Sequence, residues 1–431
     1  MTMQQVWRFR LWGAGRITTN QGKTIEVVEA GKLNTGPGPD FKDARIKIDD
    51  NLWIGNIEIH RHASDWYRHG HQNDSAYDNV VLHVVGVDDC RVQRADGSEV
   101  LQTTMQVDPE FNSMFNDFLH NPHLVLPMCG NSLPEIASIF KTDWITSLAF
   151  ERLIRKADDI LVRLKAEAGD WLQTVFISLA RGLGFGTNAD NMERLARSLP
   201  MKILLKHSDN IQTIEAMLFG QAGLLHLDSP ADEYEARLAR EYKFYAYKYG
   251  LTQPEPMHWQ MSVRNIANTP YRRIALLARI IQLNGANLGA SLSQSESLQT
   301  IRNLIDVRLS EYWIYSFSFG RTSATRMSTI GQQSHDLLAI NVLVPLIYAK
   351  GIESGNYSLT DTAVRLWEKL DAERNSITRG FQEYGIEAQN AFTSQALIQL
   401  HREYCERRRC PECRLGHRLL SSRVTIGTET Q

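Results

Sequence analysis

Hydrophobic and polar positions alternate in several short stretches of the first 110 residues. Residues 44–48 alternate, Asp49-Asp50-Asn51 has the composition of a turn, and residues 52–60 alternate again. Residues 80–87 form an apolar run, and a further strand-like stretch follows at 99–107. Closely spaced short strands joined by hairpin turns are typical of a β-rich domain. We therefore predict a small β-rich α/β domain over residues 1–110, with room for a short helix at its N-terminus.

The hydrophobic period changes after about Pro134. From residue 144 onward apolar residues recur every three or four positions, which is the spacing of one helix face. The following stretches continue this spacing: 171–183, 211–225, 233–249, 271–283, 298–309, 337–348, 362–370 and 388–405. They predict a large all-α domain over residues 135–431, with the proline-containing segment 111–134 as a linker. The expected fold class is α+β.

Composition and charge place the chain among ordinary soluble globular proteins. It has 431 residues, 43% of them hydrophobic and 22% charged, and a formal net charge of −2. These values exclude disordered and collagen-like chains. The N-terminus has no secretory signal, and no apolar run reaches the roughly 18 residues of a membrane span. We therefore expect a cytoplasmic protein without a membrane segment, in which nucleic-acid binding would require a local patch rather than the overall charge.

Acidic and basic side chains meet in the predicted hairpin around residues 40–60. Side chains two apart in a strand share a face, so Glu58 and His60 project together, whereas Trp53, Ile57 and Ile59 should face the core. An Asp at the mouth of the preceding strand, Asp40, can converge with Glu58 on one cation. Such carboxylates suit Mg²⁺ or Mn²⁺, which can lower the pKa of bound water and neutralise charge on a phosphate.

The order Pro39-Asp40, hairpin, Glu58-Ile59-His60 resembles the core of the PD-(D/E)XK nuclease superfamily, although a lysine is more usual at the position of His60. The resemblance implies a restriction-endonuclease-like sheet and hydrolysis of phosphodiester bonds in nucleic acid. It also implies that Asp40 and Glu58 hold the metal while His60 orients or activates water.

Histidines are concentrated just after this hairpin. Five of the 13 in the chain fall between residues 60 and 83: His60, His62, His69, His71 and His83. Histidine is a common metal ligand and carries protons near neutral pH, so His69 or His71 could assist at a phosphate oxygen. Two other interpretations remain open. The histidines could form a zinc hydrolase, or they could bind a protein partner together with Trp66 and Tyr67.

Three of the five cysteines lie close together near the C-terminus. Cys405, Cys410 and Cys413, with His417, have the number and type of ligands of a Zn²⁺ site. Cys129 could instead supply a fourth thiolate for an iron–sulfur cluster. A reduced segment without metal is the third interpretation. Cys90 is expected to be a lone structural thiol.

Taken whole, the chain resembles an uncharacterised bacterial family of unknown function. The resemblance rests on Gly38-Pro-Asp-Phe41, on residues 53–60, 65–71 and 77–80, and on the three C-terminal cysteines. It implies no activity, so the expected function rests on the residues themselves. We expect a metal-dependent nuclease-like protein that acts on nucleic acid. A non-catalytic protein that binds a protein partner and a histidine-centred zinc hydrolase are the alternatives.

Overall fold

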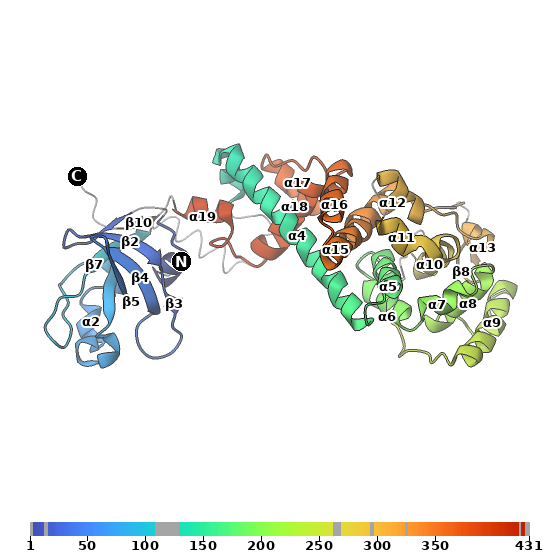
Figure 1. Ribbon diagram of the computed structural model, residues 1–431, viewed down its shortest axis with the longest axis horizontal. Coiled ribbons are helices and arrows are strands. Elements are labelled where there is room, and N and C mark those ends of the chain that lie inside the picture. The colour runs from blue at the N-terminus through green and yellow to red at the C-terminus, as the bar shows by residue number, and fades with distance from the viewer. Residues whose placement is uncertain are drawn as a thin grey trace. The chain divides into compact units, whose positions relative to one another are not determined.

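The computed structural model describes residues 3–12, 16–107, 129–261, 269–293, 297–323, 326–421 and 424–426 (Figure 1). The chain divides into two compact units, each described by itself. The first comprises Met1–Ile145, Arg379–Ile386 and Ile398–Gln431, and the second comprises Thr146–Thr378 and Glu387–Leu397. The fold class is α+β, as predicted, with a sheet in the N-terminal region and helices in most of the remainder. Most of the predicted linker, residues 111–128, lies outside the described residues.

The described part of the first unit contains one eight-stranded sheet in the order β1-β2-β4-β5-β6-β7-β10, with β3 paired to β4. Its strands are β1 (Ile17–Thr18), β2 (Thr24–Glu29), β3 (Lys32–Leu33), β4 (Phe41–Ile48), β5 (Asn51–His62), β6 (Val80–Val87), β7 (Gln102–Val107) and β10 (Val424–Ile426). The second unit has a small hairpin, β8 (Ser316–Ser318) with β9 (Arg321–Thr322).

The predicted hairpin is confirmed as β4 and β5, which pair antiparallel. Asp49 and Asp50 both have positive φ, as a tight hairpin turn requires. β5 then pairs in parallel with β6, and β6 in parallel with β7. Parallel pairing needs a crossover, and between β5 and β6 the chain makes it through a short helix and two 3₁₀ turns. The C-terminal strand β10 returns to pair antiparallel with β7.

Helices account for most of the remaining described residues. They are α1 (Met3–Arg8), α2 (Asp65–Arg68), η1 (His71–Asn73), η2 (Ser75–Tyr77), η3 (Gly130–Glu135), α4 (Ser138–Ala166), α5 (Trp171–Leu183), α6 (Ala189–Arg197), α7 (Met201–Leu205), α8 (Ile211–Gln221), α9 (Glu233–Tyr249), α10 (Pro270–Asn284), η5 (Gly285–Asn287), α11 (Leu288–Ser293), α12 (Leu298–Ile305), α13 (Glu311–Tyr315), α14 (Gln332–Leu338), η6 (Ala339–Leu343), α15 (Val344–Ser354), α16 (Tyr357–Lys369), α17 (Ser376–Glu383), α18 (Ala391–Gln399), η7 (Leu400–Cys405) and α19 (Arg414–Ser421).

Local sequence explains where several of these helices begin. The side chains of Asp170, Asn210, Asp232 and Thr269 each accept a hydrogen bond from a backbone N–H in the first turn of α5, α8, α9 and α10. Such caps satisfy donors that have no partner within the helix. Two segments, η6 and η7, are wound as π-helix, and η7 ends at Cys405.

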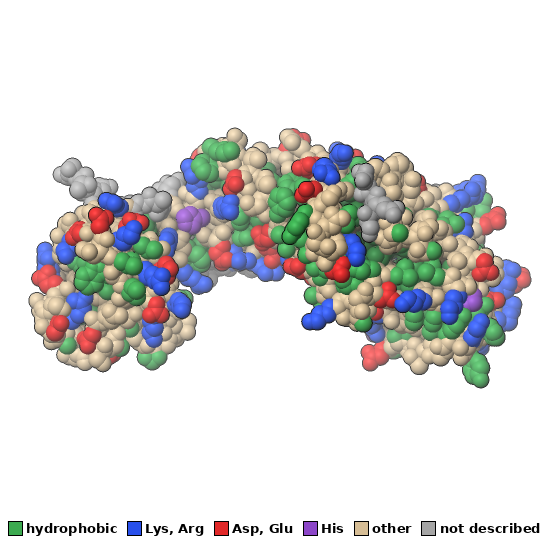
Figure 2. All heavy atoms as spheres, viewed as in Figure 1, with side chains coloured by type: hydrophobic (Ala, Val, Ile, Leu, Met, Phe, Trp, Pro, Cys, Tyr) green, Lys and Arg blue, Asp and Glu red, His purple; other side chains and the backbone are tan. Residues whose placement is uncertain are grey.

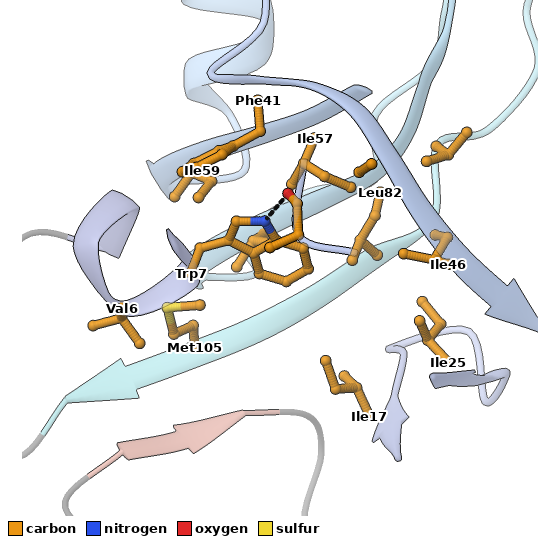
Figure 3. Packing of buried hydrophobic residues seen from close by; sticks show 14 of the residues in the cluster. Val6, Trp7, Ile17, Ile25, Phe41, Ile46, Ile57, Ile59, Leu82 and Met105 are labelled. Carbon is orange, nitrogen blue, oxygen red and sulfur yellow. Dashed lines mark hydrogen bonds between the residues drawn. The ribbon is translucent and has the colours of Figure 1, made fainter. Parts of the chain in front are cut away.

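The sheet is packed on both faces. On one face, α1 contributes Trp7, which is fully buried among Ile57, Ile59, Leu82 and Met105, and its indole N–H donates to the Ala30 carbonyl at 2.9 Å (Figure 3). A smaller cluster on the other side includes Ala63, Trp66, Tyr77, Val80, Val85, Val92 and Val100. Burial on both faces explains why β6 is apolar apart from His83, rather than alternating.

The prediction that Trp53 faces the core is wrong, because its side chain is 52% exposed. β5 begins before the sheet is covered: residues 51–54 are exposed, and burial begins only at Gly55. Strand periodicity assigns a face but cannot show where along the strand the covering layer ends.

Among the described residues, one helical stretch, Gln332–Ser354, has the length and mean hydropathy of a membrane span, although the sequence suggested none. Its 18-residue apolar window is 67% buried inside the protein, which is the behaviour of a core helix. Figure 2 shows acidic and basic side chains intermixed over the visible face of the sheet-containing part, rather than gathered in one basic surface.

Candidate functional site

Asp40 and Glu58 lie side by side where β4 begins next to β5. The backbone N–H of Asp40 donates to Glu58 Oε2 at 3.0 Å, and the N–H of Ile59 donates to Asp40 Oδ2, also at 3.0 Å. Gln4 of α1 also hydrogen-bonds the Asp40 side chain. The two carboxylates predicted to converge are therefore held together by backbone groups of the two paired strands.

This placement makes the pair electrostatically strained without a cation. Burial and the nearby Asp40 charge raise the pKa of Glu58 to about 8, and burial raises the pKa of Asp40. Only 6% of Glu58 is exposed. Two carboxyl groups in a shared buried position cannot both ionise readily unless a positive charge joins them. The pair thus provides oxygen ligands at a position that favours a cation.

Two histidines lie next to the second oxygen of Glu58, and two more lie against the ring of His60. Glu58 Oε1 lies 3.3 Å from His60 Nε2 and 3.4 Å from His71 Nε2. His60 Nδ1 lies 2.9 Å from His83 Nε2, and His69 Nδ1 lies 3.2 Å from His60 Nε2. One ring nitrogen from each of His60, His69 and His71 falls within 4.8 Å of the other two. The structure therefore brings together all five residues predicted as catalytic: Asp40, Glu58, His60, His69 and His71.

Burial favours the neutral form of three of these histidines, His60, His71 and His83. Burial, with the neighbouring histidines, lowers the pKa of His60 to about 4 and that of His83 to about 3, and burial also lowers the pKa of His71. A neutral imidazole has a lone pair for a metal or a proton. Among the described residues, His71 Nε2 and His83 Nδ1 are buried without a hydrogen-bond partner. His69 is exposed, so the cluster opens to solvent at that side chain.

Aromatic rings fix the positions of the histidines. The Tyr77 ring stacks on His71 with centroids 3.8 Å apart, and Trp66 packs edge-on against both Tyr77 and His71. Trp66 is fully buried, and its indole N–H donates to the Gln93 carbonyl at 3.1 Å. Trp66 therefore cannot contribute to a partner-binding surface, whereas Tyr67 is 40% exposed.

Three contributors to this site were not identified from the sequence. Gln4 is far from Asp40 along the chain, whereas Tyr77 ends the turn η2 shortly after His71, and no sequence pattern predicted either contact. His83 was grouped with the other histidines in the sequence, but it was assigned no role in the site. A register shift between β5 and β6 places Val81 in the core on the other side of the sheet and directs His83 to His60. The apolar run on β6 gave no sign of that irregularity.

The four cysteines predicted as possible metal ligands also lie close together. Cys129, Cys405, Cys410 and Cys413 line one small cavity in the first unit. His417 is directed elsewhere: its Nε2 donates to the Phe9 carbonyl at 2.8 Å, and its Nδ1 lies 3.3 Å from the Ser421 hydroxyl. Cys90 packs against the smaller cluster of the sheet.

Comparison with known proteins gives one family. A family model described as "Protein of unknown function (DUF2851)" matches residues 1–376. The match includes the carboxylate and histidine cluster and ends before Cys405. No curated protein and no solved structure matches the chain.

Proposed function

Since the chain belongs to this family of unknown function, we propose from the geometry of the site that the protein is a metal-dependent hydrolase of phosphodiester bonds in nucleic acid. The observation that carries the proposal is the pair Asp40 and Glu58, joined through Asp40 N–H at 3.0 Å and flanked by His60 at 3.3 Å. The positions agree with the resemblance of Asp40, Glu58 and His60 to the PD-(D/E)XK core.

Asp40 and Glu58 would hold Mg²⁺ or Mn²⁺, which when bound supplies a more acidic water and a positive charge for a phosphate oxygen. The chemistry of the donors fits such an ion, because the two carboxylates carry charges that burial disfavours. Histidine nitrogens next to the carboxylates favour Mn²⁺ over Mg²⁺, since Mg²⁺ prefers oxygen ligands.

His60 would take the proton from the attacking water. In the tautomer with the proton on Nδ1, His60 donates to His83 Nε2 and leaves the Nε2 lone pair facing Glu58 and His69. Because burial lowers the pKa of His60 to about 4, this lone pair is present at neutral pH. His69 is exposed, so it can donate to a phosphate oxygen from the solvent side.

The experiment is a cleavage assay with the full chain on supercoiled plasmid, linear duplex, single-stranded DNA and RNA, with Mg²⁺, Mn²⁺ or EDTA. We expect cleavage that depends on the metal, is abolished in Glu58→Gln and Asp40→Asn, and falls at least about 100-fold in His60→Ala. Glu26→Gln is the matched control, because Glu26 lies on the same sheet with its side chain 48% exposed. Absence of cleavage in every combination, or equal cleavage by wild type and Glu58→Gln, would refute the proposal.

A histidine-centred zinc hydrolase is the second candidate, and the convergence of His60, His69 and His71 nitrogens within 4.8 Å favours it. Three histidines and an open fourth position are a common catalytic zinc arrangement. Zn²⁺ binding measured by calorimetry distinguishes the two. The zinc hydrolase is supported if the wild type and Asp40→Asn both bind Zn²⁺ and His71→Ala does not. A folded protein that binds none of these metals would instead be a non-catalytic binding protein.

A further inference from the structure

A second cluster of ligand-type side chains lies apart from the carboxylates and histidines. Cys129 comes directly before η3, Cys405 ends η7, and Cys410 and Cys413 precede α19. Segments widely separated in sequence thus bring four thiols to one cavity. Its other lining residues are mostly apolar: Leu133, Phe381, Leu400, Tyr404, Leu415 and Gly416. None of the four thiols is in a disulfide.

The thiols are mutually close as well as buried. Burial raises the pKa of all four, and Cys410 and Cys413 further raise the pKa of Cys129, which reaches about 12. Cys405 interacts electrostatically with each of the other three thiols. Four thiols lining one apolar cavity supply a complete set of sulfur ligands for a metal ion or cluster.

The spacing of the sulfurs distinguishes between metal centres. A single zinc with Zn–S bonds of about 2.3 Å would hold its tetrahedral sulfurs about 3.8 Å apart. Among the described residues, the ligand atoms that gather in threes within 4.8 Å of one another belong to His60, His69 and His71, not to any set of these cysteines. No three of the four sulfurs lie as close together as a single zinc ion requires, so the cavity fits a larger four-thiolate cluster better than one ion.

The ligand count points the same way. The predicted zinc site needed His417 as its fourth ligand, but the His417 ring is engaged by the Phe9 carbonyl and by Ser421. The fourth position is taken by Cys129, which gives the four thiolates that iron–sulfur clusters prefer.

The backbone around the cysteines is shaped for this arrangement. The N–H groups of Leu415 and Gly416 hydrogen-bond the Cys413 sulfur, which favours its thiolate form. A Cβ at Gly416 would lie 2.4 Å from the Cys410 carbonyl oxygen, so the chain can close the knuckle only with glycine there. The π-helical turn η7 carries Cys405 at its end, and such turns occur often at functional sites.

We propose that Cys129, Cys405, Cys410 and Cys413 bind a 4Fe–4S cluster that fastens the C-terminal segment to the rest of the first unit. Cys410 packs against the hydrophobic core of the sheet, Leu420 belongs to that core, and β10 pairs with β7. The cluster therefore anchors the segment that completes the sheet. This proposal stands independently of the hydrolase proposed above.

The test is the metal content of the full chain purified without oxygen and, separately, after reconstitution with ferrous iron and sulfide. We expect about four iron and four sulfide per chain and a brown colour. Cys413→Ala and Cys129→Ala should each lose most of the iron. Cys90→Ala is the matched control, since Cys90 packs against a different cluster, and it should retain the iron.

His417→Ala separates this proposal from the zinc alternative, because it should also retain the iron. The wild-type measurement decides even if a cysteine variant does not fold. One zinc per chain in a colourless protein, two irons per chain, or a folded protein without metal after reconstitution would each overturn the proposal. Loss of metal in His417→Ala with retention in Cys129→Ala would overturn it as well.

Discussion

The metal-free protein should become less stable as pH rises above about 6.5, and replacement of Glu58 by glutamine should prevent this decline. Glu58 is 6% exposed, and its pKa is raised from 4.5 to about 8. Between pH 4.5 and about pH 8, Glu58 is protonated in the folded protein and ionised in the unfolded protein. Stability therefore falls as pH rises through this window, by about 1.4 kcal/mol per pH unit. Glutamine keeps an oxygen for the Asp40 N–H and cannot ionise.

The histidines act in the opposite direction at lower pH. The pKa of His60 is lowered from 6.5 to about 4 and that of His83 from 6.5 to about 3, so below pH 6.5 the unfolded state binds protons that the folded state excludes. Their contribution makes stability rise with pH up to about 6.5 and then stay constant. The maximum for the metal-free wild type should lie near pH 6.5, with a loss of about 2 kcal/mol by pH 8.

The assay is urea unfolding in EDTA at a series of pH values, followed by tryptophan fluorescence, in which Trp7 and Trp66 report on the sheet. Glu58→Gln should keep its midpoint from pH 6.5 to 8, while the control Glu26→Gln should lose stability as the wild type does. Mn²⁺ should restore the stability of the wild type at pH 8 and should have little effect on the stability of Glu58→Gln. If Glu58→Gln and the wild type decline equally above pH 6.5, Glu58 is not the strained group and the electrostatic account of the site is wrong.

Two further predictions concern packing. Trp7→Ala should destabilise the first unit by about 3–5 kcal/mol, because it leaves a cavity in place of a fully buried indole and removes the hydrogen bond to the Ala30 carbonyl. Thermal unfolding followed by fluorescence or calorimetry would measure this loss. Gly220→Ala should lower the melting temperature although alanine favours helix, since its Cβ would lie 2.2 Å from the Tyr242 ring. Gly380→Ala, where nothing lies within 4 Å, should leave it unchanged or raise it, and equal effects at both glycines would contradict this reasoning.

Local patterns in the sequence predict much of the fold. Alternation on either side of Asp49-Asp50 predicts the β4–β5 hairpin, and helical spacing predicts α9 over its full observed length, Glu233–Tyr249. These features depend on side-chain periodicity and turn conformation, which a few neighbouring residues determine. The sequence also predicted that Asp40, Glu58 and His60 lie close together, because all three belong to this one hairpin.

Other parts of the two clusters depend on contacts across the chain. His83 meets His60 only because β6 pairs in parallel with β5 and shifts register at the start of that pairing. Gln4 reaches Asp40 only because α1 packs on the sheet.

The sequence alone therefore determined the class of fold, the hairpin that carries the carboxylates, and the residue types able to hold metal. Tertiary structure decided which of those residues face one another: it placed Cys129 with the C-terminal cysteines and turned His417 away to the Phe9 carbonyl. The physical reason is that periodicity fixes the face of one element at a time. Contacts between distant segments depend on how separate elements pack to bury their apolar surface, and local spacing does not encode that packing.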